Sequence, residues 1–170
     1  MSADSKRTLI LLRHAKSDWP PDVPDHDRPL AKRGRHDAPA VGRWLRGQGY
    51  LPDTVVCSTA QRTRQTWDLM AAKLGTADPV VTFEPRAYGA GPQTLLYLAR
   101  ELPPVTRIAL LIGHNPGVSE LASALAEAPL SFPTAGVAVL EFDGDWSDLT
   151  PGQARLADFT VPANLHEEKL

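Results

Sequence analysis

Two arginines and two histidines stand where apolar runs of the sequence end, and together these residue types can bind and transfer a phosphoryl group. Arg13 and His14 follow the run "TLILL", and His114 follows "RIALLIG". Arg62 comes soon after a third run, "DTVVCS". A guanidinium group is a planar fork that can bind two phosphoryl oxygens. A neutral imidazole beside it has a lone pair that can attack phosphorus and form a covalent intermediate.

Capping is the plainer interpretation of Arg13 and His14. Both could simply be polar residues at the point where a strand leaves the core. A strand that only ended would more often turn on Gly, Asn or Asp. From this stretch alone, capping and chemistry both remain open, and the surrounding elements have to decide between them.

The elements that would position these side chains alternate between strand and helix patterns. Short apolar runs predict strands at 8–12, 53–58, 79–83, 107–113 and 136–142, and a last short one near 154–159. Apolar residues at helical spacing predict helices at 34–48, 62–74, 93–102 and 117–126. Pro39 must then lie in the first turn of its helix or begin it, because proline cannot donate an interior helical bond. The end of the chain, 164–170, is expected to fray.

This alternation predicts an α/β protein, a three-layer α/β/α sandwich with a mostly parallel central sheet. We expect a single domain over 1–170 with its core at about 8–160, because no repeat or flexible linker divides the chain. Ligands bind outside the carboxyl ends of parallel strands. The polar residues that follow the three apolar runs, Ser58 included, would therefore meet at one edge of the sheet. A shared site fits them better than separate caps.

Composition excludes several other classes of function. The 18 Lys and Arg balance 20 Asp and Glu without a basic block, so nucleic acid is not an expected partner. The single Cys57 allows no internal disulfide or multi-cysteine zinc site. The first residues are polar, and the apolar run after them is too short for a membrane span. We expect a cytoplasmic protein that is a monomer and does not bind membranes.

Several other residues have structural interpretations that we prefer. Cys57 lacks the arginine six positions later that cysteine phosphatases have, so a buried strand end is expected. Trp19 and Trp146 are expected to be packing residues rather than stacking platforms. No metal site is predicted, because the spacing of the available acidic and histidine residues matches no familiar site. These residues are Asp18, His26, Asp27, His36 and Asp37.

Three segments resemble motifs of the histidine phosphatase superfamily, which includes the cofactor-dependent phosphoglycerate mutases. "RHAKSDW" (13–19) resembles its arginine-histidine-glycine signature, and "CSTAQRTRQT" (57–66) resembles its second segment. "GHNPG" (113–117) resembles its second-histidine segment. The small size and the "DHDRPLAKRG" loop (25–34) are most similar to SixA-type phosphohistidine phosphatases. The resemblance covers residues 8 to about 159 and implies a phosphoglycerate mutase-like fold.

The resemblance implies a role for each matched residue. His14 would accept the phosphoryl group, and Arg13, Arg62 and His114 would form the rest of the phosphate pocket. Ser17 falls on a serine of the family signature and would add a hydroxyl contact. We expect a second contact with the substrate from the serine at position 58, where the second strand ends.

The sequence departs from the family pattern at three places. Ala15 replaces the signature glycine, and Pro20 stands where the mutases commonly have a phosphate-binding asparagine. Mutases and ester phosphatases of the family also supply a carboxylic acid after the third strand, which protonates the leaving oxygen. Here that segment has only Glu84, directly before Pro85, and no further acid until Glu101. An alkoxide leaving group would therefore depart unassisted.

These observations predict a metal-independent phosphatase that works through a phosphohistidine intermediate and needs no cofactor. The expected substrate is protein phosphohistidine or another phosphoramidate, so the partner is a phosphorylated protein or a small phosphorylated molecule. The alternatives are a phosphatase for small phosphate esters and a phosphate-binding module with little turnover. A metal-dependent phosphoesterase is a more distant alternative.

Overall fold

The computed structural model describes residues 5–75 and 78–167. The strands are β1 (Lys6–Arg13), β2 (Thr54–Ser58), β3 (Val80–Glu84), β4 (Ile108–Gly113), β5 (Val137–Asp143) and β6 (Arg155–Thr160). The α-helices are α1 (Lys32–Gln48), α2 (Gln61–Leu74), α3 (Pro92–Arg100), α4 (Gly117–Ala126) and α5 (Pro162–Glu167). Short 3-10 helices lie at η2 (Asp25–Asp27), η3 (Pro85–Ala87) and η4 (Trp146–Asp148). Strands and helices thus alternate along most of the chain, as the hydrophobic pattern predicts.

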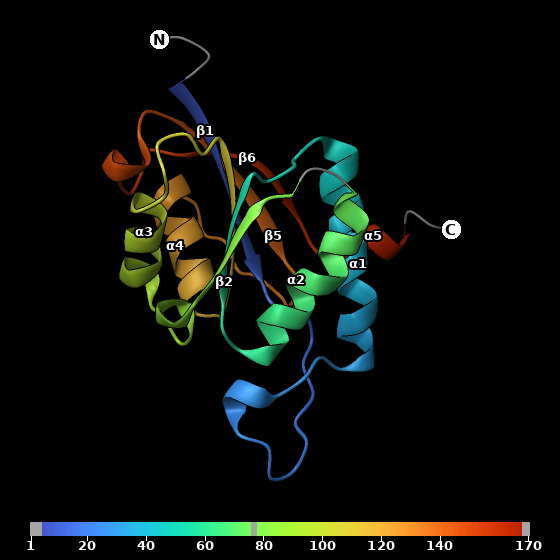
Figure 1. Ribbon diagram of the computed structural model, residues 1–170. Helices are drawn as coiled ribbons and strands as arrows, with labels where there is room; N and C mark the ends of the chain where they lie inside the picture. Colours follow the sequence, from blue (N-terminus) through green and yellow to red (C-terminus); the bar gives the residue numbers. More distant parts are fainter. Residues whose placement is uncertain (1–4, 76–77, 168–170) are drawn as a thin grey trace.

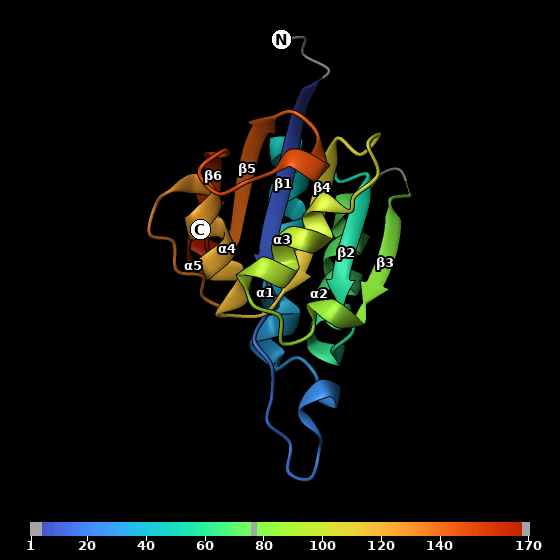
Figure 2. The same ribbon diagram turned by 90° about the vertical axis from the view of Figure 1, so that its left-hand side faces the viewer.

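The strands form one central sheet in the order β3-β2-β4-β1-β5-β6. β1 pairs in parallel with β4, β4 with β2, and β2 with β3, whereas β5 runs antiparallel to both β1 and β6. Helices α1, α2 and α5 cover one face of the sheet, and α3 and α4 cover the other (Figure 1 and Figure 2). The predicted three-layer α/β fold with a mostly parallel sheet is confirmed.

The core is divided by the sheet into two apolar clusters. In β1, Leu9 and Leu11 belong to the cluster beneath α3 and α4, whereas Ile10 and Leu12 belong to the one beneath α1 and α2. All four side chains are buried. A strand whose neighbouring residues point to opposite faces must be apolar throughout when both faces are covered. This explains why "TLILL" is a continuous apolar run.

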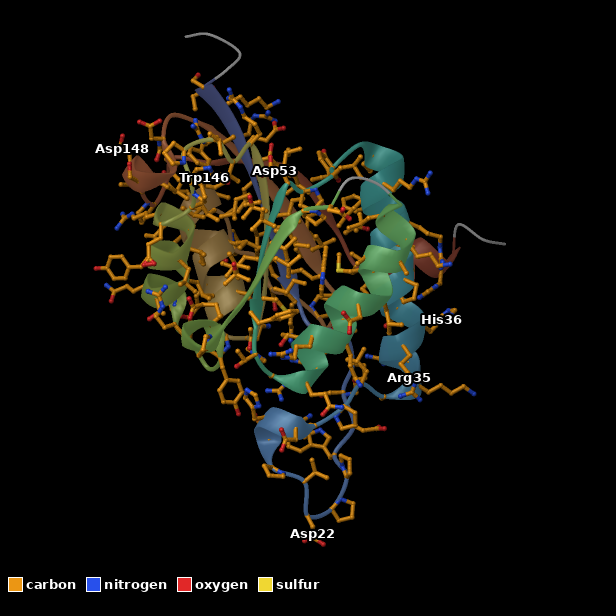
Figure 3. All side chains as sticks on the ribbon, viewed as in Figure 1. Asp22, Arg35, His36, Asp53, Trp146 and Asp148 are labelled. Atoms are coloured by element: carbon orange, nitrogen blue, oxygen red, sulfur yellow. The ribbon has the colours of Figure 1, made fainter. Side chains whose placement is uncertain are left out.

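The carboxyl ends of β1, β2 and β4 meet at one edge of the sheet, from which a loop extends away from the layers (Figure 1). We call residues 18–28 the projecting segment; Asp22 lies at its tip (Figure 3). Its base is held against α1, because the carbonyl oxygen of Lys16 accepts a hydrogen bond of 2.8 Å from the amide of Ala31. A Cβ on Gly34 would lie only 2.1 Å from that same oxygen. Glycine therefore allows helix and loop to approach closely.

Two expectations about the helices were wrong. α1 begins at Lys32 and continues through Pro39, which lies in its interior rather than in its first turn. Ala38 and Val41 on either side of the proline are fully buried, so packing outweighs the lost backbone bond. The end of the chain does not fray from residue 164, because α5 continues to Glu167 and Leu165 is buried. Residues 168–170 lie outside the described part of the chain.

Candidate active site

A polar cavity of about 180 Å³ lies where β1 and β4 end and α2 and α4 begin. It is lined by Arg13, His14, Lys16, Ser17, Trp19, Arg28, Arg62, His114, Asn115 and Thr134. The structure therefore brings together five of the six residues singled out from the sequence. The sixth, Ser58, does not line the cavity. The helix N-termini at this edge add partial positive charge to that of the arginines and favour an anionic ligand.

His14 is held in one orientation and one tautomer. Its Nδ1 atom lies 2.7 Å from the carbonyl oxygen of Ala15. A carbonyl can only accept a hydrogen bond, so Nδ1 carries the proton and Nε2 of the neutral ring carries a lone pair. Burial lowers the pKa of His14 to about 3, with smaller contributions from neighbouring charges. The imidazole is therefore neutral and nucleophilic at physiological pH.

His114 is held by its other nitrogen. Its Nε2 atom lies 2.7 Å from Oγ of Ser58, which also accepts a bond of 3.3 Å from the amide of Ala60. Of these two partners, only His114 can accept the serine proton, and we assign the proton of the neutral ring to Nδ1 because this arrangement satisfies the hydroxyl. Among the described residues, Nδ1 is buried and has no hydrogen-bond partner. Burial lowers the pKa of His114 to about 4, with the Arg62 charge acting in the same direction.

Ser58 therefore lies behind the site and not in it. The side chain is fully buried and supports His114, so the expected direct contact with a substrate is not what the structure shows. The sequence placed Ser58 at the correct sheet edge. It could not indicate that the hydroxyl points to the histidine directly after β4, since that contact joins residues far apart in the chain.

Arg62 is oriented by the projecting segment. Its two terminal nitrogens donate to the carbonyl oxygen of Asp25 at 2.8 Å and to Oδ2 of the same residue at 3.1 Å. Its Nε is buried and has no partner among the described residues. Tyr88 also donates to Oδ2 of Asp25, at 2.5 Å. The Tyr88 hydroxyl, followed by Arg28 and Arg62, holds the pKa of Asp25 well below its usual range.

Arg28 is a further cation of the cavity that the sequence analysis did not single out. It donates to the carbonyl of Asp18 at 2.9 Å, to Oδ1 of Asp25 at 2.9 Å and to Oγ of Ser17 at 2.6 Å. Ser17 thus lines the cavity as predicted, but its hydroxyl oxygen already accepts a bond from Arg28. Neither Arg28 nor Asp25 lies in a strand or in an α-helix, so periodicity could not find them. The "DHDRPL" loop motif was the available signal.

Arg13 is anchored by a backbone carbonyl of the segment that follows α4. One of its terminal nitrogens donates to the carbonyl oxygen of Phe132 at 2.9 Å, and the Asn115 side chain donates to the same oxygen at 2.9 Å. Its Nε is buried and without a partner in the described part of the chain. The rings of His14 and His114 lie side by side in the same cavity, with centroids 5.3 Å apart.

No carboxylate lines the cavity among the residues that the structure describes. Glu84 accepts hydrogen bonds from the amide and the guanidinium group of Arg86, which lower its pKa. Asp25 contacts Arg62 but is held ionised, so it cannot donate a proton near neutral pH. The sequence suggests that no acid is positioned to protonate a leaving group. Among the described residues, the lining of the cavity likewise contains none.

The structure also places the cysteine and the two tryptophans that the sequence analysis considered. Cys57 is buried, and burial raises the pKa of its thiol to about 12. Trp146 is buried as predicted, whereas Trp19 is 75% exposed and borders the cavity. Within residues 5–75 and 78–167, no group of three or more His, Cys, Asp or Glu side chains could hold a metal ion. No helix in these ranges is long and apolar enough to span a membrane.

Comparison with known proteins places this arrangement in a family. Residues 9–86 match the model of the histidine phosphatase superfamily, branch 1. An uncharacterized protein of Mycobacterium tuberculosis is 41% identical over 162 residues, which cover 89% of this chain and 99% of the relative. A structure from Nakamurella multipartitia, provisionally assigned as the phosphohistidine phosphatase SixA, is 34% identical. It has a TM-score of 0.81 and the match covers 92% of this chain and 96% of that one.

Proposed function

The chain belongs to the histidine phosphatase superfamily, and we propose that it is a phosphatase in which His14 accepts the phosphoryl group of protein phosphohistidine or another phosphoramidate. The observation that carries this proposal is the tautomer of His14. Its Nδ1 proton is bound by the carbonyl of Ala15, which leaves the Nε2 lone pair for attack on phosphorus.

The other cavity residues fit the stabilisation of a phosphoryl group. Arg13, Arg28 and Arg62 offer guanidinium donors to its oxygens, and His114, which lines the same cavity, is the further donor in this proposal. Fixed donors and positive charges around a transferring phosphoryl group supply most of the catalysis in such reactions. The cavity thus provides one nucleophile surrounded by groups that bind an anion.

The proposed reaction proceeds in two displacements. Nε2 of His14 attacks phosphorus, the P–N bond of the substrate breaks, and the departing nitrogen takes a proton from solvent. Water then attacks the phosphoryl group on His14, losing its proton to solvent, and releases inorganic phosphate and the neutral imidazole. Because the imidazole of a phosphohistidine side chain is protonated by solvent and leaves as a neutral ring, the missing carboxylic acid has little effect on this substrate.

The leaving group therefore determines whether phosphoramidates or alkyl esters are hydrolysed with the higher kcat/KM. A positioned general acid is usually worth about 10² to 10⁴ in rate, so kcat/KM for phosphohistidine peptides or phosphoramidate should exceed that for an alkyl phosphate by about 10² or more. Aryl phosphates with acidic phenols should fall between the two. The measurement compares these substrates at several pH values.

Two carboxylate variants serve as controls for this comparison. Glu84→Gln and Asp18→Asn should retain the wild-type order of substrates, because neither carboxylate lines the cavity. Efficient hydrolysis of alkyl phosphates that either variant loses would show that an acid is present and that the protein is an ester phosphatase. Saturable binding of phosphohistidine without release of phosphate would instead identify a binding module.

A further inference from the structure

Trp19 is a large aromatic side chain exposed at the rim of the cavity. It is 75% exposed, although it borders a site whose histidines are buried. The guanidinium carbon of Arg28 lies 3.2 Å from the centroid of the indole ring, so a cation covers one face of the ring. An exposed indole does not contribute to the core, and its position beside the nucleophile calls for another explanation.

The Arg28 guanidinium group, on which the indole stacks, is held in place by hydrogen bonds. Arg28 is buried and donates to the Asp18 carbonyl, to Asp25 and to Ser17, so its guanidinium plane is fixed at three points. Stacked on this plane, Trp19 presents an aromatic surface in a defined position next to the phosphoryl cavity. A preorganised surface of this kind loses little entropy when a flat group packs against it.

We propose that Trp19 is a specificity-determining residue whose indole stacks with the imidazole ring of a phosphohistidine side chain. This inference rests on the proposed function, because it assigns a place to the group that leaves when His14 takes the phosphoryl group. A flat heteroaromatic ring bonded directly to phosphorus would reach the rim when the phosphoryl group occupies the cavity. Ammonia, the leaving group of phosphoramidate itself, has no ring and gains nothing from the indole.

The test compares two substrates that differ in the ring. The specificity ratio is kcat/KM for a phosphohistidine peptide divided by kcat/KM for phosphoramidate. In Trp19→Ala this ratio should fall about threefold to tenfold, the range expected for the loss of one aromatic pair. Trp19→Phe, which keeps an aromatic face, should retain most of the ratio.

Tyr97→Ala is the matched control. Tyr97 is also an exposed aromatic residue, 57% accessible, and lies near an arginine, with the Arg100 guanidinium carbon 5.8 Å from its ring centroid. It belongs to α3 and does not line the cavity. This variant should leave both activities and their ratio unchanged. An unchanged ratio in Trp19→Ala, or an equal loss on both substrates, would overturn the inference while leaving the proposed function intact.

Binding to an inactive protein tests the inference without turnover. In a His14→Asn background, the affinity for the phosphohistidine peptide should fall by a similar factor when Trp19 becomes alanine, whereas the affinity for phosphoramidate should fall less. Equal losses for the two ligands would overturn the stacking role. Absence of hydrolysis by the wild-type protein would contradict the proposed function, and this binding comparison would still decide the role of Trp19.

Discussion

At the scale of single residues, the two histidines differ in which ring nitrogen the protein binds. Ala15 binds Nδ1 of His14 through a carbonyl, and Ser58 binds Nε2 of His114 through a hydroxyl. One ring is thereby left with a free lone pair and the other with a free N–H. Under the proposed function this difference makes one histidine the nucleophile and the other a hydrogen-bond donor to the phosphoryl group.

Ser58→Ala tests the support of His114. Without the hydroxyl, the preference for the Nδ1–H tautomer is lost, and we expect kcat to fall about tenfold with a smaller change in KM. This is less than the roughly 10² to 10³ expected for removing a donor outright, as in His114→Ala. Steady-state kinetics on phosphoramidate measure both variants.

A double-mutant cycle shows whether Ser58 acts through His114. In the His114→Ala background, Ser58→Ala should cause little further loss, since the group that it orients is already absent. Losses that multiply in the double variant would contradict a positioning role and would indicate that the hydroxyl acts independently of the histidine.

At the scale of elements, the projecting segment supplies groups that the strands and helices cannot. Asp25 from this segment binds Arg62 of α2, Tyr88 from the loop after β3, and Arg28 beside Trp19. Two other parts of the chain, α2 and the loop after β3, therefore converge on a carboxylate of the projecting segment. We interpret Asp25 as a residue that positions Arg62 rather than as an acid.

Asp25→Ala tests this interpretation. An unrestrained arginine must lose conformational freedom when it binds phosphate, which costs up to about 1.5–2 kcal/mol, or up to about 10- to 30-fold in kcat/KM. Asp25→Asn retains one acceptor oxygen and should lie between the alanine variant and the wild type. Activity equal to or above the wild type in Asp25→Ala would contradict the interpretation, because it would show that the carboxylate competes with the substrate for Arg62.

The sequence predicted elements well where hydrophobic periodicity is strong. Each predicted strand and helix is present within a few residues of its expected bounds, and the sheet edge that unites Arg13, His14, Arg62 and His114 followed from their alternation. The interior position of Pro39 and the helix after β6 were missed because tertiary packing decides them. The projecting segment has no periodicity, so its contacts could not be predicted.

At the scale of the whole molecule, the two buried histidines make the free energy of unfolding depend on pH. Burial lowers the pKa of His14 to about 3 and of His114 to about 4, from an ordinary value of 6.5. Between these values the unfolded chain binds more protons than the folded protein does. The free energy of unfolding should therefore be highest above about pH 6.5 and should decrease as the pH falls toward 4.

His14→Gln measures the share of this effect that belongs to one imidazole. Urea denaturation of the wild type should show a clear loss of stability between about pH 7.5 and about pH 5, and the variant should lose less over the same interval. Asp25 does not affect this comparison of stability losses. Its pKa is lowered, so its carboxylate is protonated only at still lower pH in both proteins. An equal loss in the two proteins would contradict a neutral, buried His14.

The central claim is that His14 carries the phosphoryl group during the reaction. The direct measurement is to mix the protein briefly with radiolabelled phosphoramidate, quench it in alkali and map the labelled peptide. The account predicts acid-labile, alkali-stable phosphate on His14, and neither label nor turnover in the His14→Asn variant. Label on His114, or continued release of phosphate by His14→Asn, would contradict it.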